Sequence, residues 1–502
     1  MAPPDGLLGL ASNGGTAPCC NCNHPYRELT THSTQPGNLK TMPSIANASR
    51  NLSGWGRYPW INCHTEYAAS PSDAARKLHS AGNASVIARG LGRAYGDAAG
   101  IDGGTVINAT KLDCLQSFDH ESGTLRCEAG VSLQQIIDVF LPRGWFLPTT
   151  PGTKFVTVGG AIAADIHGKN HHRVGSFGEF VDEFRLLTAS GAILRCSRSE
   201  NPEIFYATIG GMGLTGIILD AAFRLTRVNS AWIEVDYTKT RNLDHTFEAF
   251  QAGDQFHEHS VAWVDCVATG DLLGRGVVMQ GNHALRSSIP GKAVDHPLQL
   301  PKKRAASVPF APPFSLLNRW TVRAFNNVFY WKHSDGKAVV DLDTFFYPLD
   351  SVANWNRLYG RSGFIQYQAF FPQTTSQQGL RELLSRVAAT GSASFLAVLK
   401  SCGKADGGLL SYLEPGHTLA LDLPYHPRHT PALCRDLDEI LLRHGGRLYL
   451  AKDSMASAQT IRAMYPRLPE FLKIKREIDP AGRFVSSLAK RLGLTTEAEG
   501  TL

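Results

Sequence analysis

Between about residues 52 and 227, short apolar runs with the alternation of β-strands are followed in turn by segments whose apolar residues have the spacing of a helix. Strands are predicted at 85–89 and 105–108, and helices at 70–81 and 132–140. The first of these helices starts with Ser-Pro-Ser-Asp, which is typical of a helix N-terminus. This mixed order predicts an α+β fold.

From residue 231 onward, alternating patterns at 232–237 and 261–267 favour strands of a second sheet, with a helix between them at 246–256. Residues 289–320 contain six prolines and the basic cluster Lys302-Lys303-Arg304, so they are predicted to form a long insertion or mobile loop. Regular patterns then return. They predict strands at 339–348, 363–371, 394–400 and 418–423, helices at 378–390, 431–444 and 457–465, and a basic tail.

Residues 1–50 are rich in Gly, Pro and Asn and lack hydrophobic periodicity, which predicts a disordered leader. Cys19 and Cys22 have CxxC spacing, but no second pair completes a zinc site. The apolar stretch 6–11 is too short for a secretory signal, and no window approaches 18 continuous apolar residues. We therefore expect no signal peptide and no spanning helix, and a cytoplasmic or peripherally membrane-associated protein.

Composition narrows the class of protein. The 502 residues are 43% hydrophobic, enough to fill more than one core, and 48 of them are glycine, which favours a loop-rich chain whose backbone approaches a ligand closely. With 50 basic and 44 acidic residues the net charge is only +6, so nucleic acid is a poor default partner. An anionic substrate or a lipid headgroup remains open.

The first motif with chemical meaning is Ala-Arg-Gly-Leu-Gly-Arg-Ala-Tyr-Gly-Asp-Ala at 88–98. Glycines at 90, 92 and 96 directly follow a predicted strand, and they leave room for backbone N–H groups to converge on a phosphate. The spacing is not the dinucleotide-binding fingerprint. A glycine-rich turn with structural arginines is an equally good interpretation of these residues alone.

The second motif spans 151–172. Small residues at 159–164 allow the backbone to pack against a large ligand, and a polar cluster follows from Asp165 to His172. His167 and His171 have metal-ligand spacing, but Gly168 disfavours the helix that this spacing needs, so no metal site is predicted. A solvated loop stays open as an alternative.

The third motif, Gly211-Met-Gly-Leu-Thr-Gly216, satisfies GxGxxG literally. A dinucleotide site needs a strand before these glycines and a helix after them. Here a helix is predicted at 201–208 and a strand at 217–225, so the order is reversed. NAD binding is therefore not predicted.

Taken together, Ala-Arg-Gly-Leu-Gly-Arg-Ala-Tyr-Gly-Asp, Asp-Ile-His-Gly-Lys-Asn-His-His and Ala-Lys-Asp-Ser at 451–454 resemble the vanillyl-alcohol-oxidase flavoprotein superfamily, and within it the decaprenylphosphoryl-ribose 2-oxidase family. The resemblance runs from about 52 to 494. It implies a two-part FAD-binding domain of the PCMH type, at 52–227 and completed by 450–494. It also implies a substrate (cap) domain at 228–449, built on an antiparallel sheet with flanking helices.

The same resemblance assigns residues to the cofactor. Arg93 stands where members with covalently bound flavin usually carry His, and 151–172 contain no Cys, so non-covalent FAD is implied. The residues implied to contact FAD are Ala88, Arg89, Gly90, Leu91, Gly92, Arg93, Ala94, Tyr95, Gly96, Asp97, Ala98, Gly152, Thr157, Val158, Gly159, Gly160, His167, Gly168, Lys169, Asn170, Ile218 and Tyr449.

For the chemistry, the resemblance makes Lys452 the cation beside the flavin and makes His167 a candidate for removing the hydroxyl proton, although His167 fits a flavin-packing role equally well. Residues implied to line the sugar pocket are Tyr95, Tyr347, Gln366, Gln368 and Lys400. A strand at 364–370 places Gln366 and Gln368 on one face. The alternative interpretation is that this face is an exposed polar strand face that binds no ligand. Ala420 replaces the family's Cys and Thr418 its Asn, which leaves the sugar's identity open.

The expected activity is oxidation of a secondary hydroxyl of a sugar to a keto group, most of all a polyprenyl-phosphate-linked pentose. Alternatives are a soluble aldonolactone or alditol oxidase that uses oxygen, and a flavin-binding scaffold without turnover. A reductase partner that completes an epimerase and a quinone or oxygen acceptor are further expectations. The apolar residues of 308–314 and the basic cluster at 302–304 suggest contact with a membrane surface.

Overall fold

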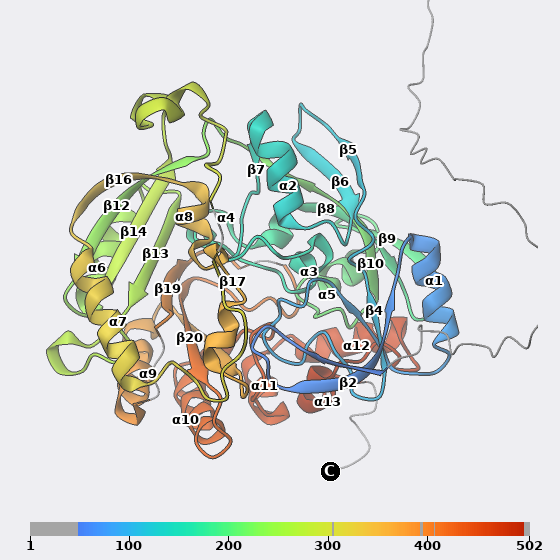
Figure 1. Cartoon of the computed structure of the whole chain (residues 1–502). Helices are drawn as coiled ribbons and strands as arrows, with labels where there is room; N and C mark the ends of the chain where they lie inside the picture. Colours follow the sequence, from blue (N-terminus) through green and yellow to red (C-terminus); the bar gives the residue numbers. More distant parts are fainter. Residues whose placement is uncertain (1–48, 304–305, 392–394, 406, 496–502) are drawn as a thin grey trace, which may run out of the picture. The chain divides into compact units, whose positions relative to one another are not determined.

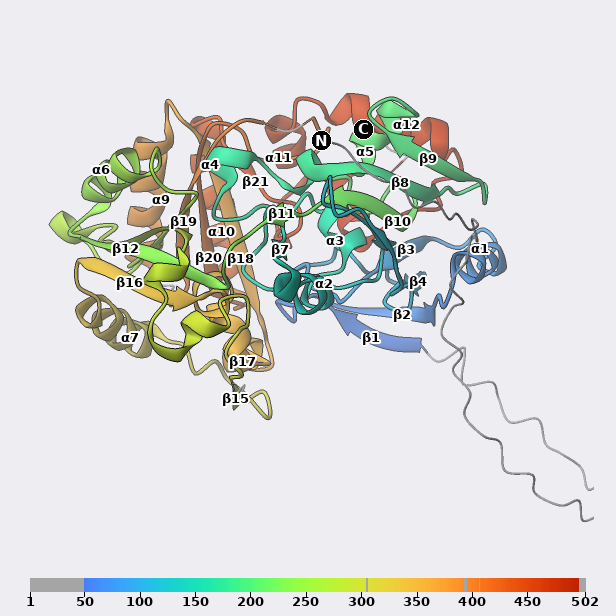
Figure 2. The same ribbon diagram turned by 90° about the horizontal axis from the view of Figure 1, so that it is seen from above.

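The computed structural model describes residues 49–303, 306–391, 395–405 and 407–495. The leader with Cys19 and Cys22 lies outside this part of the chain, except that residues 49 and 50 begin strand β1. The described residues belong to one compact unit. Figures 1 and 2 show this unit in two views.

The first sheet has the order β1-β2-β4-β3, formed by Ser49–Ser53, Trp60–Tyr67, Thr105–Asn108 and Val86–Arg89. Strands β2 and β3 both run parallel to β4. Helix α1 (Pro71–Ser80) links β2 to β3, and the Ser70 side chain caps it by accepting from the Asp73 N–H. At its other edge β3 pairs with the C-terminal end of the chain, since Val86 exchanges backbone hydrogen bonds with Arg483 and Val485.

The second sheet is antiparallel, with the order β5-β6-β10-β8-β9: Leu115–Phe118, Thr124–Glu128, Ile217–Arg224, Val181–Leu187 and Ile193–Ser197. Strand β10 is buried along seven of its eight residues, as its continuous apolar run predicts. Helices α2 (Leu133–Phe140), α3 (Val158–Ala163), α4 (His171–Val174) and α5 (Pro202–Thr208) and the pair β7 (Trp145–Phe146) and β11 (Thr226–Arg227) accompany it. Helix α5 precedes the GxGxxG segment and β10 follows it, so the predicted reversed order is confirmed.

The third sheet has eight strands in the order β16-β12-β14-β13-β19-β20-β18-β21. Its pairs are antiparallel, with long registers such as β18 (Phe364–Pro372) against β20 (Gly416–Pro424). The remaining strands are β16 (Gly336–Asp341), β12 (Trp232–Thr240), β14 (Gly276–His283), β13 (His259–Val264), β19 (Ala397–Cys402) and β21 (Arg447–Leu448). Figure 1 shows helices α6 (Leu243–Gly253), α7 (Arg319–Lys332), α9 (Ser376–Thr390) and α10 (Thr430–Arg443) flanking this sheet. The predicted α+β fold class is confirmed.

The C-terminal segment returns to the first part of the chain. It forms α11 (Ala458–Met464), α12 (Leu468–Ile478) and α13 (Ser487–Leu492), and α12 contacts α5. The two latter helices replace the basic tail that the sequence predicts. Most of their charged residues are exposed, whereas Lys475 of α12 is buried. Leu468, Phe471 and Leu488 are buried as well.

Three other predicted elements differ from the structure. The strand predicted at 339–348 ends at Asp341, because this side chain accepts from the Thr344 N–H and starts helix α8 (Leu342–Phe346). The helix predicted at 246–256 begins three residues earlier, since Asn242 caps α6. The predicted insertion 289–320 contains short elements, among them β15 (Ala306–Ser307), which pairs with β17 (Val352–Ala353), and it runs into an unpredicted helix, α7.

Within the described ranges, no helix is long and apolar enough to cross a membrane.

Candidate functional site

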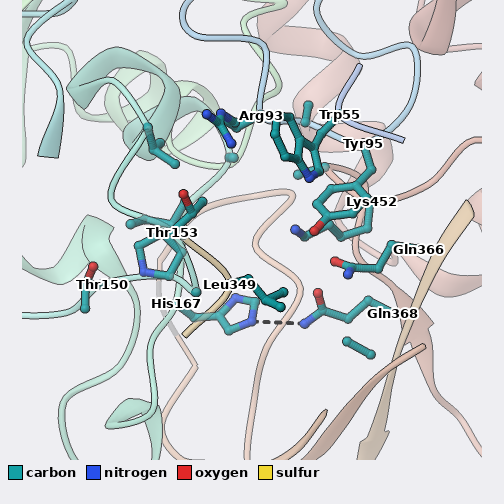
Figure 3. Close-up of a pocket in the computed structure, with 18 of the residues that line it drawn as sticks. Trp55, Arg93, Tyr95, Thr150, Thr153, His167, Leu349, Gln366, Gln368 and Lys452 are labelled. Carbon is teal, nitrogen blue, oxygen red and sulfur yellow. Dashed lines mark hydrogen bonds between the residues drawn. The ribbon is translucent and has the colours of Figure 1, made fainter. Parts of the chain in front are cut away.

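A cavity of about 660 Å³ extends from the glycine loop at 88–95, past Lys452, to helix α7. Its walls come from segments that are far apart in the sequence: the glycine loop, 150–169, 344–350, residues of β13, β18, β19 and β20, and 449–452. Figure 3 shows the middle of this cavity, where Tyr95, His167, Gln366, Gln368 and Lys452 lie around a common space.

At Gly90 the glycine loop lies against the start of α3 without room for a side chain. A Cβ at Gly90 would overlap the Thr157 side chain, and Gly92 has a left-handed φ of +67° with Arg89 packed behind it. Arg89 stabilises the loop from inside, because its guanidinium donates to the Ser53 carbonyl (2.7 Å) and the Ala99 carbonyl (3.0 Å). The backbone of this loop is thus exposed to the cavity, as a close approach of phosphates requires.

The end of the loop is held by an ion-pair cluster outside the cavity. Arg491 of α13 donates to Asp97 (2.8 Å) and to Asp453 (2.8 Å), and these pairs join the glycine loop to the segment that carries Lys452. Gly96 lies beside the Asp453 backbone, where a Cβ would overlap it. Neither Gly96 nor Asp97 lines the cavity, so their implied contact with a cofactor stays a prediction, and a supporting role is what the geometry shows.

The small residues of the second motif form one wall. Thr157 caps α3 by accepting from the Gly160 N–H, and Gly159, Gly160 and Ala164 line the cavity. Val158, Gly168 and Asn170 were implied cofactor contacts but do not line it: Asn170 instead donates to the Pro148 carbonyl (2.8 Å). The other implied cofactor residues line the cavity, namely Ala88, Arg89, Gly90, Leu91, Gly92, Arg93, Ala94, Tyr95, Ala98, Gly152, Thr157, Gly159, Gly160, His167, Lys169, Ile218 and Tyr449.

His167 is buried, and Figure 3 shows its ring directed at the amide of Gln368. The Gln368 Nε2 group donates to the Tyr412 hydroxyl (2.8 Å) and lies 3.0 Å from His167 Nε2. In this arrangement Nε2 accepts, so Nδ1 carries the proton of the neutral ring, and Nδ1 has no hydrogen-bond partner among the described residues. Burial and the nearby Lys400 hold the pKa of His167 well below its usual range.

Lys452 lies beside Tyr95, with its Nζ atom 3.8 Å from the centre of the Tyr95 ring. Burial lowers the pKa of Lys452 to about 7, opposed by the charge of Asp422. Asp422 is itself fully buried, accepts a hydrogen bond from Gln366 Nε2 (2.6 Å), and has its pKa raised to about 7 by burial. The site therefore joins two groups that change protonation state near neutral pH.

Two further lysines add positive charge to the cavity. Lys400 projects from β19, and burial lowers its pKa to about 8. Lys169 donates to the Phe345 carbonyl, and burial together with Lys400 lowers its pKa to about 7. Cations held in a buried space stabilise anionic ligands.

Tyr347 was predicted to line the sugar pocket, but the structure places it behind the cavity wall. Its hydroxyl is hydrogen-bonded to the Thr150 hydroxyl (2.6 Å), and Thr150 faces the cavity in its place. Tyr95, Gln366, Gln368 and Lys400 do line the cavity. Their contact with a sugar stays a prediction.

Several lining or supporting residues were not predicted. Trp55 lines the cavity and stacks on the Arg93 guanidinium (4.0 Å), and Asp422 supports Gln366. Trp263, Phe325, Phe329 and Phe395 form the apolar end. A buried carboxylate in an apolar strand, as in Leu-Ala-Leu-Asp-Leu at 419–423, is the one sequence signal that could have identified Asp422.

The arrangement fits a long cofactor with phosphates, such as the FAD that the sequence implies. A glycine-rich loop and an α-helix start of small residues meet at one end, and the unpartnered Nδ1–H of His167 and the lysines lie further along. The backbone N–H groups of the loop would hold the pyrophosphate, and Gly159, Gly160 and Ile218 would contact the flat part of the molecule.

Comparisons with known proteins also indicate an FAD-binding protein. Sequence families described as "FAD binding domain" and "D-arabinono-1,4-lactone oxidase" match residues 67–197 and 398–492. The chain is 37% identical over 452 residues to the decaprenylphosphoryl-beta-D-ribose oxidase of Mycolicibacterium smegmatis, covering 89% of this chain and 98% of that protein. It is 33% identical to an uncharacterised Streptomyces coelicolor protein, covering 72% and 100%, and 30% identical to a putative D-arabinono-1,4-lactone oxidase of Neurospora crassa, covering 25% and 23%. The chain therefore belongs to the decaprenylphosphoryl-ribose oxidase family of FAD-dependent oxidoreductases, which act on CH–OH groups.

Proposed function

We propose that this sugar-related oxidoreductase oxidises a secondary hydroxyl of a pentose that is linked through phosphate to a polyprenyl lipid. The observation that carries the proposal is the cavity itself. It continues from the half-buried lysines Lys169 and Lys400 to an apolar end formed by Trp263, Phe325 and Phe329. A free sugar has no use for the apolar end, whereas a lipid phosphate uses both parts.

In this proposal the residues around Lys452 position the sugar. Gln366 is held by Asp422 and Gln368 by Tyr412, so both amides are fixed in direction before substrate binds. The His167 Nδ1–H donates a hydrogen bond to an oxygen in the cavity. Because Nε2 accepts from Gln368, His167 holds a proton rather than removes one, which differs from the role that the sequence suggests.

Lys452 then becomes the proton acceptor. Its neutral amine takes the proton of the substrate hydroxyl at Nζ, and the ammonium that results supplies positive charge next to the reacting carbon. FAD, when bound, accepts the hydride from that carbon. Tyr95 and Asp422 stabilise the ammonium as it forms.

The rate of substrate oxidation is expected to rise with pH through about 7 and then level off. Burial lowers the pKa of Lys452 to about 7, and only the neutral amine accepts a proton, so the rate should fall about tenfold per pH unit below this value. Rapid-mixing measurement of flavin reduction at saturating substrate tests this. A rate that stays constant or falls as pH rises through 7 would contradict the role of Lys452 as acceptor.

Gly92→Val is expected to yield protein without FAD. A Val side chain is strained at a φ of +67° and would displace Arg89, which supports the loop. The ratio of flavin to protein absorbance after purification measures occupancy. Gly82→Val is the control, because Gly82 has φ +55° but open space around it and lies away from the cavity. Full occupancy in Gly92→Val would show that the loop does not hold the cofactor.

FAD is expected to be released intact when the protein is precipitated with acid. Arg93, at the position where relatives with covalent flavin carry His, is held between Trp55 and Phe155 and offers no nucleophile. Absorbance of the supernatant measures the released flavin. Colour that stays with the pellet would contradict non-covalent binding.

The match of 398–492 to D-arabinono-1,4-lactone oxidase favours a second candidate, a soluble lactone oxidase. An anaerobic test separates the two, with loss of flavin absorbance as the signal. We expect loss with a short-chain prenyl-phosphoryl pentose and little with free pentoses, alditols or aldonolactones. Loss with a free aldonolactone alone would overturn the proposal, and loss with no compound would favour a scaffold. Which acceptor, quinone or oxygen, reoxidises the flavin, and whether a reductase partner completes an epimerase, stay predictions.

A further inference from the structure

We propose that helix α7 and the segment before it, residues 310–316, form a docking surface for an anionic lipid bilayer, from which the lipid part of the substrate enters the cavity. The docking itself rests on exposed side chains and charge. The entry route rests on the proposed function.

Helix α7 is fixed to the body of the protein by one face. Asn318 caps it by accepting from the Trp320 and Thr321 N–H groups, and the buried Asn326 donates to Asp265 (2.7 Å). Phe329 packs on Trp263 of β13, with ring centres 4.6 Å apart. The opposite face of α7 therefore has a fixed direction and stays largely exposed, with Lys239 of β12 lying over the Trp331 ring (4.2 Å).

This outer face is strongly apolar. Trp320 is 76% exposed and Trp331 is 71% exposed, and Val328 between them is exposed as well. These positions recur with the period of a helix, so they form a single stripe. Phe310 and Phe314, also largely exposed, come from the adjoining segment. Exposed aromatic residues are usual singly on a soluble surface, whereas a group of this size marks an interaction site.

The charged residues along this stretch of the chain are basic up to Asp335, which follows α7. Residues 296–334 contain no Asp or Glu but have six basic residues. Arg319, Arg323 and Lys332 are exposed on α7 itself, beside the stripe. Tryptophans flanked by Arg and Lys are the pattern of helices that lie in a membrane interface, with the rings at the headgroup level and the cations on anionic lipids.

The stripe is continuous with the cavity. Phe325 is partly exposed on α7 and also lines the cavity, together with Phe329 and Phe395. A lipid chain that leaves the cavity at this end thus passes along apolar side chains of α7. An enzyme docked by this face can bind the sugar phosphate of its substrate while the lipid tail stays partly in the bilayer, which avoids exposing that tail to water.

The test uses the full-length protein with FAD bound and two kinds of vesicle, one of phosphatidylcholine and one that also contains phosphatidylglycerol. We expect sedimentation with the anionic vesicles, and loss of at least about tenfold in apparent affinity for Trp320→Ser/Trp331→Ser. Arg319→Gln/Arg323→Gln should lose about fivefold per charge on anionic vesicles only. The matched control is Phe256→Ser, since Phe256 is 70% exposed but lies alone on another element.

Lipids brominated in their acyl chains provide a second readout, because they quench only tryptophans that enter the bilayer. Wild-type fluorescence should fall on binding, and the fall should be lost in the double Trp variant. If wild-type protein does not bind anionic vesicles, or if Phe256→Ser weakens binding as much as the Trp variant, the docking surface is wrong. Self-association that the Trp variant abolishes, without vesicle binding, would assign the stripe to a second copy of the chain instead.

The proposed function and the proposed docking surface can be refuted independently of each other. Oxidation of a short-chain, water-soluble substrate should be unchanged in Trp320→Ser/Trp331→Ser, because neither residue lines the cavity. Oxidation of the long-chain substrate in vesicles should fall with vesicle affinity. If no lipid-linked sugar is oxidised at all, the vesicle results still test whether α7 docks on a membrane. Only the proposed entry route of the substrate is then refuted.

Discussion

Lys452→Ala is expected to lower the rate of flavin reduction by about 10²–10³-fold, or about 2.7–4 kcal/mol of transition-state stabilisation, while leaving the fold and most FAD binding intact. The variant loses both the proposed proton acceptor and the cation that forms from it. The oxidised cofactor loses less, because the charge develops only during the reaction. Single-turnover flavin reduction under anaerobic conditions is the measurement, since product release or reoxidation can limit steady-state rates.

Two companion variants separate the functions of Lys452. Lys452→Arg keeps the charge but cannot accept a proton near neutral pH, so it should rescue little activity and lose the pH dependence. Lys400→Met removes a neighbouring cation of the same cavity that is proposed to bind phosphate, so it should raise KM more than it lowers kcat. An alanine variant of Lys452 that reduces its flavin at the wild-type rate would remove this residue from the mechanism.

Lys475→Met is expected to lower the free energy of unfolding by about 3–5 kcal/mol, because it leaves the buried carboxylate of Asp479 without its cation. Both side chains are fully buried in α12 and the residues after it, with Lys475 Nζ 2.9 Å from the Asp479 carboxylate. Lys475 Nζ also donates to the Leu214 carbonyl (3.0 Å) and the Phe484 carbonyl (2.8 Å), so it joins the Gly213 turn to the C-terminal segment. Denaturant unfolding of the holoprotein measures the loss.

A surface pair on the same helix is the control for this prediction. Arg467 and Glu470 are about half exposed, so Glu470→Gln should change stability by only about 0–1 kcal/mol. Adding Asp479→Asn to Lys475→Met should recover part of the loss, because no unpaired charge then remains buried. If Lys475→Met unfolds at the same denaturant concentration as Glu470→Gln, the buried pair does not hold the C-terminal segment.

The sequence predicts best where a local pattern decides the structure. The strand predicted at 363–371 and the reversed order around the GxGxxG segment follow from alternation and apolar runs. Both are observed, the strand as β18 at 364–372. Helix α8 was predicted as strand because its Phe345 and Phe346 continue an apolar run, whereas the Asp341 cap decides otherwise. Helix α7 was missed because Trp320, Val328 and Trp331 give it an apolar outer face, so its pattern lacks the polar side of an ordinary surface helix.

In the site, the chain-local motifs around 88–95 and 157–169 were found from the sequence, and most of their residues line the cavity. What could not be found are contacts between distant segments. Tyr347 faces Thr150 and not the cavity, and the donation from Gln368 that fixes the tautomer of His167 depends on Tyr412. Such directions follow from tertiary packing, which no spacing in the sequence encodes.

The pairing of Val86 with Arg483 and Val485 also has a consequence for biosynthesis. The strand that leads into the glycine loop obtains its edge partner from residues 483–485, just before α13 and about four hundred residues later. Loop closure over such a separation is slow, and it cannot begin before residue 485 has left the ribosome. We therefore expect FAD to bind only after this pairing has formed. Nascent chains that are truncated before this point should accumulate as flavin-free species exposed to proteolysis.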